Sequence, residues 1–147
     1  MYQRILVATD GSTLSKKAVK SAIELAALCG AELVVVKVIP RYPQSYFDGG
    51  MGMQPEDVRR IENQWANEGQ SVVDAVRKSA LAKGVVAKAL TVKSDVVSDA
   101  LIATAKKNRC DLIVMASHGR KGIKRLLLGS ETQHVLTHAS IPVLILK

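Results

Sequence analysis

The sequence predicts an α/β fold in which a doubly wound parallel sheet carries helices on both faces. Short apolar segments rich in valine, isoleucine and leucine alternate along the chain with segments of helical periodicity. Their hydrophobic residues form continuous runs, which is typical of parallel strands buried on both sides. The chain has 147 residues, of which 48% are hydrophobic, and this is enough to build one core. We therefore expect a single domain over residues 1–147.

The first part of the chain predicts a strand, a helix and a second strand. RILVA (residues 4–8) and ELVVVKVI (residues 32–39) are the two buried strands. Between them, Ser12 or Thr13 can cap the start of a helix and Gly30 can end it. Its apolar positions recur at steps of three or four residues: Leu14, Ala18, Ala22, Leu25 and Cys29.

Residues 40–55 hold three of the four prolines and follow neither period, so they predict a long loop that closes over something. Pro55 suits the first position of a long helix that ends near Gly84. We expect the core-facing stripe of this helix to contain Val58, Ile61, Trp65, Val72 and Val76.

The last part of the chain predicts three strands and two helices. The strands are expected at residues 85–92, 111–116 and 141–146, and the helices at 97–108 and from Ser130 onward. In such sheets ligands bind at the carboxyl ends of the strands, where the strand order reverses. The residues that follow the strands there are TDGS, Ile-Pro and ASHG.

The chain is basic. Its formal net charge is +8 and its pI is about 9.7, which favours anionic ligands and acidic partners. Aromatic residues make up only 3% of the chain, whereas binders of single-stranded nucleic acid usually stack bases on aromatic side chains. We expect no specific nucleic-acid binding.

The two cysteines, Cys29 and Cys110, lack the spacing of a metal or redox motif. The start of the chain lacks the pattern of a signal peptide. No apolar run approaches the roughly 18 residues of a membrane-spanning helix. These features predict a cytoplasmic protein with buried packing thiols and no membrane segment.

One loop has the composition of an anion site. The segment ASHGRKGIKRLLLGSETQ (residues 116–133) places four cations between Gly119 and Gly129: Arg120, Lys121, Lys124 and Arg125. It matches neither the P-loop nor the dinucleotide-binding pattern. Gly119 permits close approach of an anion, and Ser130 with Gln133 has the spacing of a capping box. A helix that starts here would direct free N–H groups at a phosphate.

Two other constellations are weaker. His134 and His138 stand four residues apart, with Glu131 one turn earlier, but the metalloprotease motif is absent, so solvated histidines are the simpler interpretation. Asp10, His118 and Ser117 or Ser130 contain the residue types of a hydrolytic triad. Without a GxSxG elbow, the sequence does not predict acyl hydrolysis.

The segments ILVATDGS, DLIVMASHGR, LLLGSETQHVL and IPVLIL together resemble the universal stress protein family over essentially the whole chain. Nucleotide-binding members of that family carry G-x2-G-x9-G-[ST]. The corresponding positions here are Ala116, Gly119, Gly129 and Ser130, so alanine replaces the first glycine. If that position requires a positive φ, the alanine is strained, and restoring glycine would tighten binding.

The resemblance implies a Rossmann-like sheet with strand order 3-2-1-4-5, similar to the adenine nucleotide alpha hydrolases. It implies that ATP, ADP or AMP binds with Mg²⁺ or Mn²⁺. Asp10 would contact the ribose, Ala8, Thr9 and Val38 would border the adenine, and the glycine loop would hold the phosphates. The residues that would complete the site are Met115, Ala116, Ser117, Gly119, Gly129, Ser130 and Glu131.

Three functions from different classes remain open. The first is a nucleotide-binding stress-response module that regulates an unidentified protein partner, with slow or incidental hydrolysis. The second is a nucleotide-independent module that acts through protein contacts. The third is an ATP-using enzyme of the ATP-pyrophosphatase type, but TDGSTLS departs from the SGGxDS loop of that group.

The C-terminal segment IPVLIL predicts a homodimer. In the implied strand order it forms a sheet edge, yet it is apolar on both faces. Such an edge is usually paired, covered or charged. We expect Val143, Leu144, Ile145 and Leu146 of two chains to pair antiparallel about a twofold axis.

Overall fold

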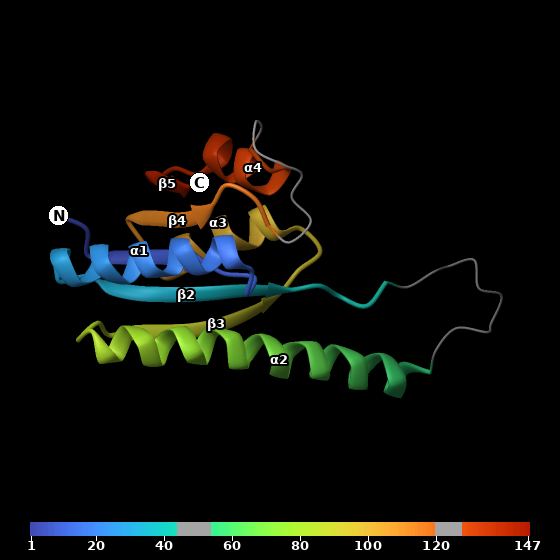
Figure 1. Cartoon of the computed structure of the whole chain (residues 1–147). Helices are drawn as coiled ribbons and strands as arrows, with labels where there is room; N and C mark the ends of the chain where they lie inside the picture. Colours follow the sequence, from blue (N-terminus) through green and yellow to red (C-terminus); the bar gives the residue numbers. More distant parts are fainter. Residues whose placement is uncertain (44–53, 120–127) are drawn as a thin grey trace.

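A computed structural model describes residues 1–43, 54–119 and 128–147 (Figure 1). Most of the predicted loop at 40–55 lies outside the described residues. The same is true of the four cations of the anion loop, Arg120, Lys121, Lys124 and Arg125.

In the described part of the chain, five strands form one parallel sheet in the order β3-β2-β1-β4-β5, so the predicted doubly wound fold is confirmed. The strands are β1 (Arg4–Ala8), β2 (Glu32–Ile39), β3 (Ala87–Lys93), β4 (Leu112–Ala116) and β5 (Val143–Leu146). Strand β3 begins two residues later than predicted, because Val85 still belongs to the turn that ends the preceding helix. Its N–H donates to the Ala80 carbonyl oxygen at 2.9 Å.

Helices cover both faces of the sheet. Those in the described residues are α1 (Thr13–Cys29), α2 (Pro55–Ala82), α3 (Val97–Lys107) and α4 (Ser130–His138). Helices α1 and α2 pack over one face, and α3 and α4 over the other. None of these helices combines the length and apolarity needed to cross a membrane.

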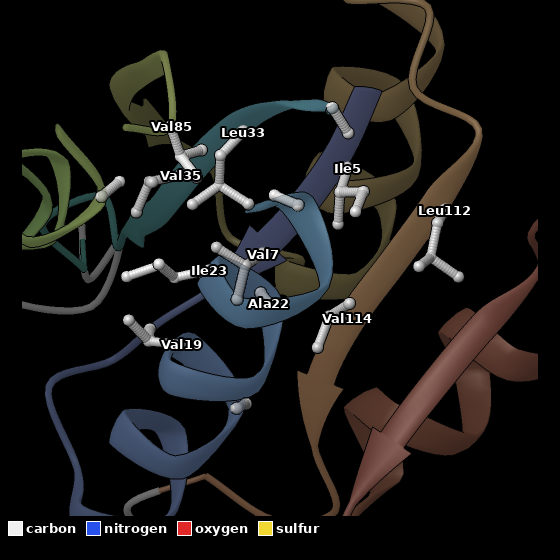
Figure 2. Packing of buried hydrophobic residues seen from close by; sticks show 14 of the residues in the cluster. Ile5, Val7, Val19, Ala22, Ile23, Leu33, Val35, Val85, Leu112 and Val114 are labelled. Carbon is white, nitrogen blue, oxygen red and sulfur yellow. The ribbon is translucent and has the colours of Figure 1, made fainter. Parts of the chain in front are cut away.

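Alternate residues of each strand enter two separate cores. The α1/α2 core receives Ile5, Val7, Leu33, Val35, Leu112 and Val114, most of which Figure 2 shows facing α1. The α3/α4 core receives Leu6, Val34, Val36, Ile113 and Met115. This double burial explains why the strands are continuous apolar runs.

Helix α1 begins and ends as predicted. The Ser12 hydroxyl accepts the Ser15 N–H at 3.2 Å, and Gly30 takes the left-handed conformation with φ 65°. The predicted stripe is displaced by about one position, since Val19 and Ile23 are buried while Leu25 is only half-buried. The small side chains of Ala18, Ala22 and Ala26 allow α1 to pack closely on the sheet. Because of this close packing, the neighbouring Val19 and Ile23 are buried as well.

Helix α2 approaches the sheet through Gly69. A Cβ there would collide with Ile39 Cδ1, so a larger residue would require the Ile39 side chain to move. The deepest positions of the helix are Gly69, Val73 and Ala80, and the predicted stripe lies beside them, half-buried. Trp65 stacks on Tyr42 with ring centroids 6.2 Å apart.

The described cysteines are packing residues. Cys110 is buried, and burial raises the pKa of its thiol to about 11. Its thiolate, which is the reactive form, is therefore scarce at neutral pH. Cys29 is half-buried at the end of α1.

Glu62 holds the chain that leaves β2 against the sheet edge. Its carboxylate accepts the Lys93 Nζ at 2.6 Å and the Tyr42 N–H at 3.0 Å. The hydrogen bond from Lys93 is the main reason that the pKa of Glu62 lies below its ordinary value of 4.5, with the Tyr42 N–H second. Glu62 thus joins α2, β3 and the segment after β2.

We predict that Glu62→Gln is less stable than the wild type at neutral pH, because the ion pair is lost. A lowered carboxyl pKa stabilises the fold above the ordinary value of 4.5, and this stabilisation disappears as the pH falls through the folded-state pKa. Urea unfolding across this range measures the difference between the two proteins. The difference in stability between the wild type and Glu62→Gln should disappear in acid. Glu68→Gln, an exposed change on the same helix, is the control, and an equal pH effect there would contradict the assignment.

Candidate functional site

The predicted binding loops meet at the carboxyl ends of β1 and β4, where the strand order reverses. A Cβ added at Gly119 would lie 3.2 Å from Asp10 Oδ2. The TDGS turn after β1 and the ASHG segment after β4 therefore face each other. Gly119 does not adopt a positive φ, so the close approach to Asp10, and not backbone conformation, requires glycine here.

Hydrogen bonds within the TDGS turn fix its shape. Asp10 Oδ1 accepts the Ser12 N–H at 2.8 Å, which leaves Oδ2 on the side of Gly119. The Thr9 hydroxyl accepts the Gly11 N–H and lies 3.2 Å from Ser15 Oγ. Gly11 has φ 80°, a conformation that favours glycine. The Asp10 carboxylate is consequently oriented before any ligand arrives.

Lys37 is a site residue that the sequence analysis did not identify. Its Nζ donates to the Asp10 carbonyl oxygen at 3.3 Å, so a cation lies beside the turn. Its stem packs where Gly69 leaves room. A single lysine inside the apolar strand ELVVVKVI was the available signal.

The far end of the loop returns to β4 at Gly129. The Gly129 N–H donates to the Ser117 carbonyl oxygen at 2.9 Å, and a Cβ at Gly129 would stand 3.3 Å from that oxygen. Both motif glycines thus serve close contacts between the segments that follow β1 and β4. The chain between them, apart from Leu128, lies outside the described residues.

The predicted capping box is wrong. Gly129 is the N-cap of α4, with φ −60° and ψ 153°, and Ser130 is the first helical residue. The Gln133 side chain donates to the Leu128 carbonyl oxygen at 3.2 Å. The tight contact of Gly129 with Ser117 places the helix start one residue earlier than a capping box would. Within the described residues, the N–H groups of Ser130 and Glu131 have no acceptor, as an anion site requires.

Thr132 and Glu131 position this helix start. The Thr132 hydroxyl, buried in the fold, donates to the Ala116 carbonyl oxygen at 3.0 Å. Glu131 Oε2 accepts the Ser98 N–H at 2.9 Å and so caps α3, whose own N-cap, Val96, has no side-chain acceptor. Thr132 was not predicted. Because the Glu131 carboxylate is used in this hydrogen bond, its backbone N–H is the group that remains for a ligand.

The remaining predicted residues lie at the strand ends. Ala8 and Val38 are half-buried beside the α3/α4 core, and Ala8 pairs with Val36, so β2 extends beyond the end of β1. Met115 is 6% exposed, with its side chain in the same core. Ala116 is 8% exposed, and its methyl group lies in the α1/α2 core.

Ala116 does not have a positive φ, so the condition under which it would be strained is not met. Among the described non-glycine residues, only Arg109 has a positive φ. Ala116 is the last residue of β4, where it pairs with Leu146. A methyl group that points into the core does not project into the crevice.

The residues of the possible triad and of the histidine pair form hydrogen bonds and ring contacts with neighbouring side chains. Ser117 Oγ lies 3.0 Å from His118 Nδ1, but Ser117 is only 4% exposed and so is poorly placed to attack a substrate. His134 lies 3.0 Å from Asp99 Oδ1, and its ring stacks on His138. Across the described ranges, no three His, Cys, Asp or Glu side chains form a group that would hold a metal ion.

The family model for the universal stress protein family matches residues 1–147. The chain belongs to the universal stress protein family. It is 32% identical to universal stress protein MJ0531 of Methanocaldococcus jannaschii, over 100% of this chain and 83% of that protein. It is 30% identical to universal stress protein YxiE of Bacillus subtilis, over 100% of both.

Solved structures of relatives share the fold. MJ0577 of Methanocaldococcus jannaschii has a TM-score of 0.84 at 26% identity, with 100% of this chain and 96% of that chain covered. A universal stress protein in complex with cAMP has a TM-score of 0.72 at 28% identity, with 99% of this chain and 97% of that chain covered. These likenesses agree with the observed strand order.

We predict that Ala116→Gly destabilises the protein by about 1 kcal/mol, because glycine weakens a strand and the buried methyl group is lost. Urea unfolding at neutral pH measures the change. A more stable variant would mean that Ala116 is strained after all.

Proposed function

We propose that this chain binds an adenine nucleotide, ATP, ADP or AMP, in the crevice between β1 and β4 and acts as a nucleotide-responsive regulatory module, with slow or incidental hydrolysis. The observation that carries the proposal is the convergence of three features at one edge of the sheet. These are the oriented carboxylate of Asp10, the close approach of Gly119 to it, and the N–H groups at the start of α4 that have no acceptor among the described residues.

Each part of a nucleotide has a partner at this edge of the sheet. In the proposal, Asp10 Oδ2, on the side of Gly119, accepts a ribose hydroxyl. The half-buried side chains of Ala8 and Val38 provide an apolar surface at the strand ends, against which the base packs. The N–H groups of Ser130 and Glu131, at the positive end of the α4 dipole, receive phosphate oxygens.

The family supports this assignment. The relative in complex with cAMP shares 28% identity and covers nearly the whole chain, so a member of the family with this fold binds an adenine nucleotide, which supports the proposal. A divalent ion, Mg²⁺ or Mn²⁺, would be held chiefly by phosphate oxygens, since the described residues contain no group of three ligating side chains. The regulated protein partner and the cytoplasmic location stay predictions.

We predict that ATP binds and that Asp10→Ala and Gly119→Val each weaken binding by at least about tenfold, the scale of one lost charged hydrogen bond. The first variant removes the ribose acceptor, and the second pushes a side chain against Asp10 Oδ2. Titration calorimetry with MgATP measures the affinities, and Asp95→Ala, an exposed change, is the control.

Two outcomes would count against the proposal. Unchanged affinity in both variants would place the nucleotide elsewhere. Absence of ATP, ADP, AMP and cAMP binding to the wild type would favour the nucleotide-independent module.

We also propose a homodimer through β5. This strand pairs with β4 alone among the described strands, so one of its edges is open. Leu144 is 40% exposed and Leu136 on α4 is 48% exposed, which leaves apolar surface near that edge. Antiparallel pairing of two β5 strands would satisfy the open edge and close on itself.

We predict that Leu144→Lys gives a monomer. Leu144 is the suitable position because Val143 and Ile145 pack into the α3/α4 core of their own chain, where lysine would disturb folding. In a dimer, two lysines would meet near the axis. Sedimentation velocity measures the oligomeric state, with Leu28→Lys, which is 86% exposed on α1, as the control. A monomeric wild type, or a dimeric Leu144→Lys, would refute the interface.

A further inference from the structure

A second concave site lies between α1 and α2, separate from the crevice at α4. Both helices start at the carboxyl edge of the sheet and run in the same direction over one face (Figure 1). Between them is a groove of about 730 Å³, within the size range of small-molecule sites. Thr9 and Gly11 line its end at the carboxyl edge, and Lys83 lies at the other end.

The walls of the groove are apolar, and its shape follows from small side chains. Helix α1 contributes Val19 and Ile23, and helix α2 contributes Val72 and Val76. Along α2, small residues at four-residue spacing border the same groove: Ser71, Ala75 and Ser79. Residues four apart lie on one helix face, so this face has no large side chain to fill the space between the helices.

The hydroxyl groups that line the groove are already used within the chain. Ser71 Oγ donates to the Asn67 carbonyl oxygen and Ser79 Oγ to the Ala75 carbonyl oxygen, each at 3.1 Å. Thr9 Oγ1 accepts the Gly11 N–H. The hydroxyl hydrogens of Ser71 and Ser79 are therefore engaged, and the rest of the lining between the helices is mainly apolar, which suits a hydrocarbon chain.

The charges at the rim select an anion. Lys16, Lys20 and Lys83 border the groove against one carboxylate, Glu24. None of these four forms an ion pair within the described residues. Lys16 and Lys20 lie one turn apart on the same face of α1.

We propose that the groove binds a single-chain amphiphilic anion, a long-chain carboxylate, with its head group between Lys16 and Lys20 and its hydrocarbon chain along Val19, Ile23 and Val76. The apolar walls suit the chain, and the two lysines suit the carboxylate. Because the groove shares Thr9 and Gly11 with the TDGS turn, its test uses the nucleotide-free protein.

Titration calorimetry with octanoate, decanoate and dodecanoate, below their micelle concentrations, tests the chain. Each methylene that enters the groove should tighten binding about fourfold, the equivalent of its transfer free energy. Ala75→Trp fills the groove from an exposed position and should abolish dodecanoate binding. Ala82→Trp, on the same helix but outside the groove, should leave it unchanged.

Two matched comparisons test the head group and its source. Lys20→Glu should weaken dodecanoate binding about tenfold or more, while Lys17→Glu, with the same net charge but outside the groove, should not. Sedimentation with phosphatidylglycerol vesicles tests whether a membrane is the source. Because the chain carries a net charge of +8, we expect only binding that is lost at physiological salt and is unchanged by Ala75→Trp.

Three results would overturn the proposal. The first is dodecanoate binding that is insensitive to both chain length and Ala75→Trp. The second is vesicle binding that persists at physiological salt and is abolished by Ala75→Trp, since this would make a membrane lipid the occupant of the groove. The third is absence of carboxylate binding together with self-association that Ala75→Trp disrupts, which would assign the groove to a second copy of the chain.

Discussion

The complete burial of β1 is the constraint on which the rest of the molecule depends. Ile5, Leu6 and Val7 are all 0% exposed, because β2 and β4 flank the strand and helices cover both of its faces. Nothing polar can interrupt such a strand without losing its partners. Polar chemistry therefore begins where β1 ends, at Thr9 and Asp10. The position of the crevice is a direct result of how the core is closed.

This constraint also explains why most of the fold could be predicted from the sequence. A strand buried on both faces must be a continuous apolar run, and such a run is easy to detect even in a single sequence. The details that failed were decided by contacts between distant residues. The start of β3 moved because Val85 is held by Ala80, and α4 starts at Ser130 because Gly129 packs on Ser117. Neither contact can be predicted from the local sequence pattern.

The residues of the candidate site likewise fall into those that the sequence could predict and those that it could not. Asp10, Gly119 and Gly129 could be predicted because they stand in a motif, and the structure gives each a steric or hydrogen-bonding reason. Lys37 and Thr132 could not be predicted, since their roles depend on which strand end each reaches in three dimensions. The motif position Ala116 was misjudged for a related reason. Its conformation and the direction of its methyl group are set by pairing with β5.

Glu131 couples two helix starts through one residue. Its backbone belongs to the first turn of α4, which lines the crevice, while its carboxylate holds the first turn of α3 through Ser98 at 2.9 Å. A displacement of the α4 turn therefore acts on the start of α3 through this hydrogen bond, to the extent that rotation of the Glu131 side chain does not absorb it. Two helix starts that are 33 residues apart in the sequence thus share one contact.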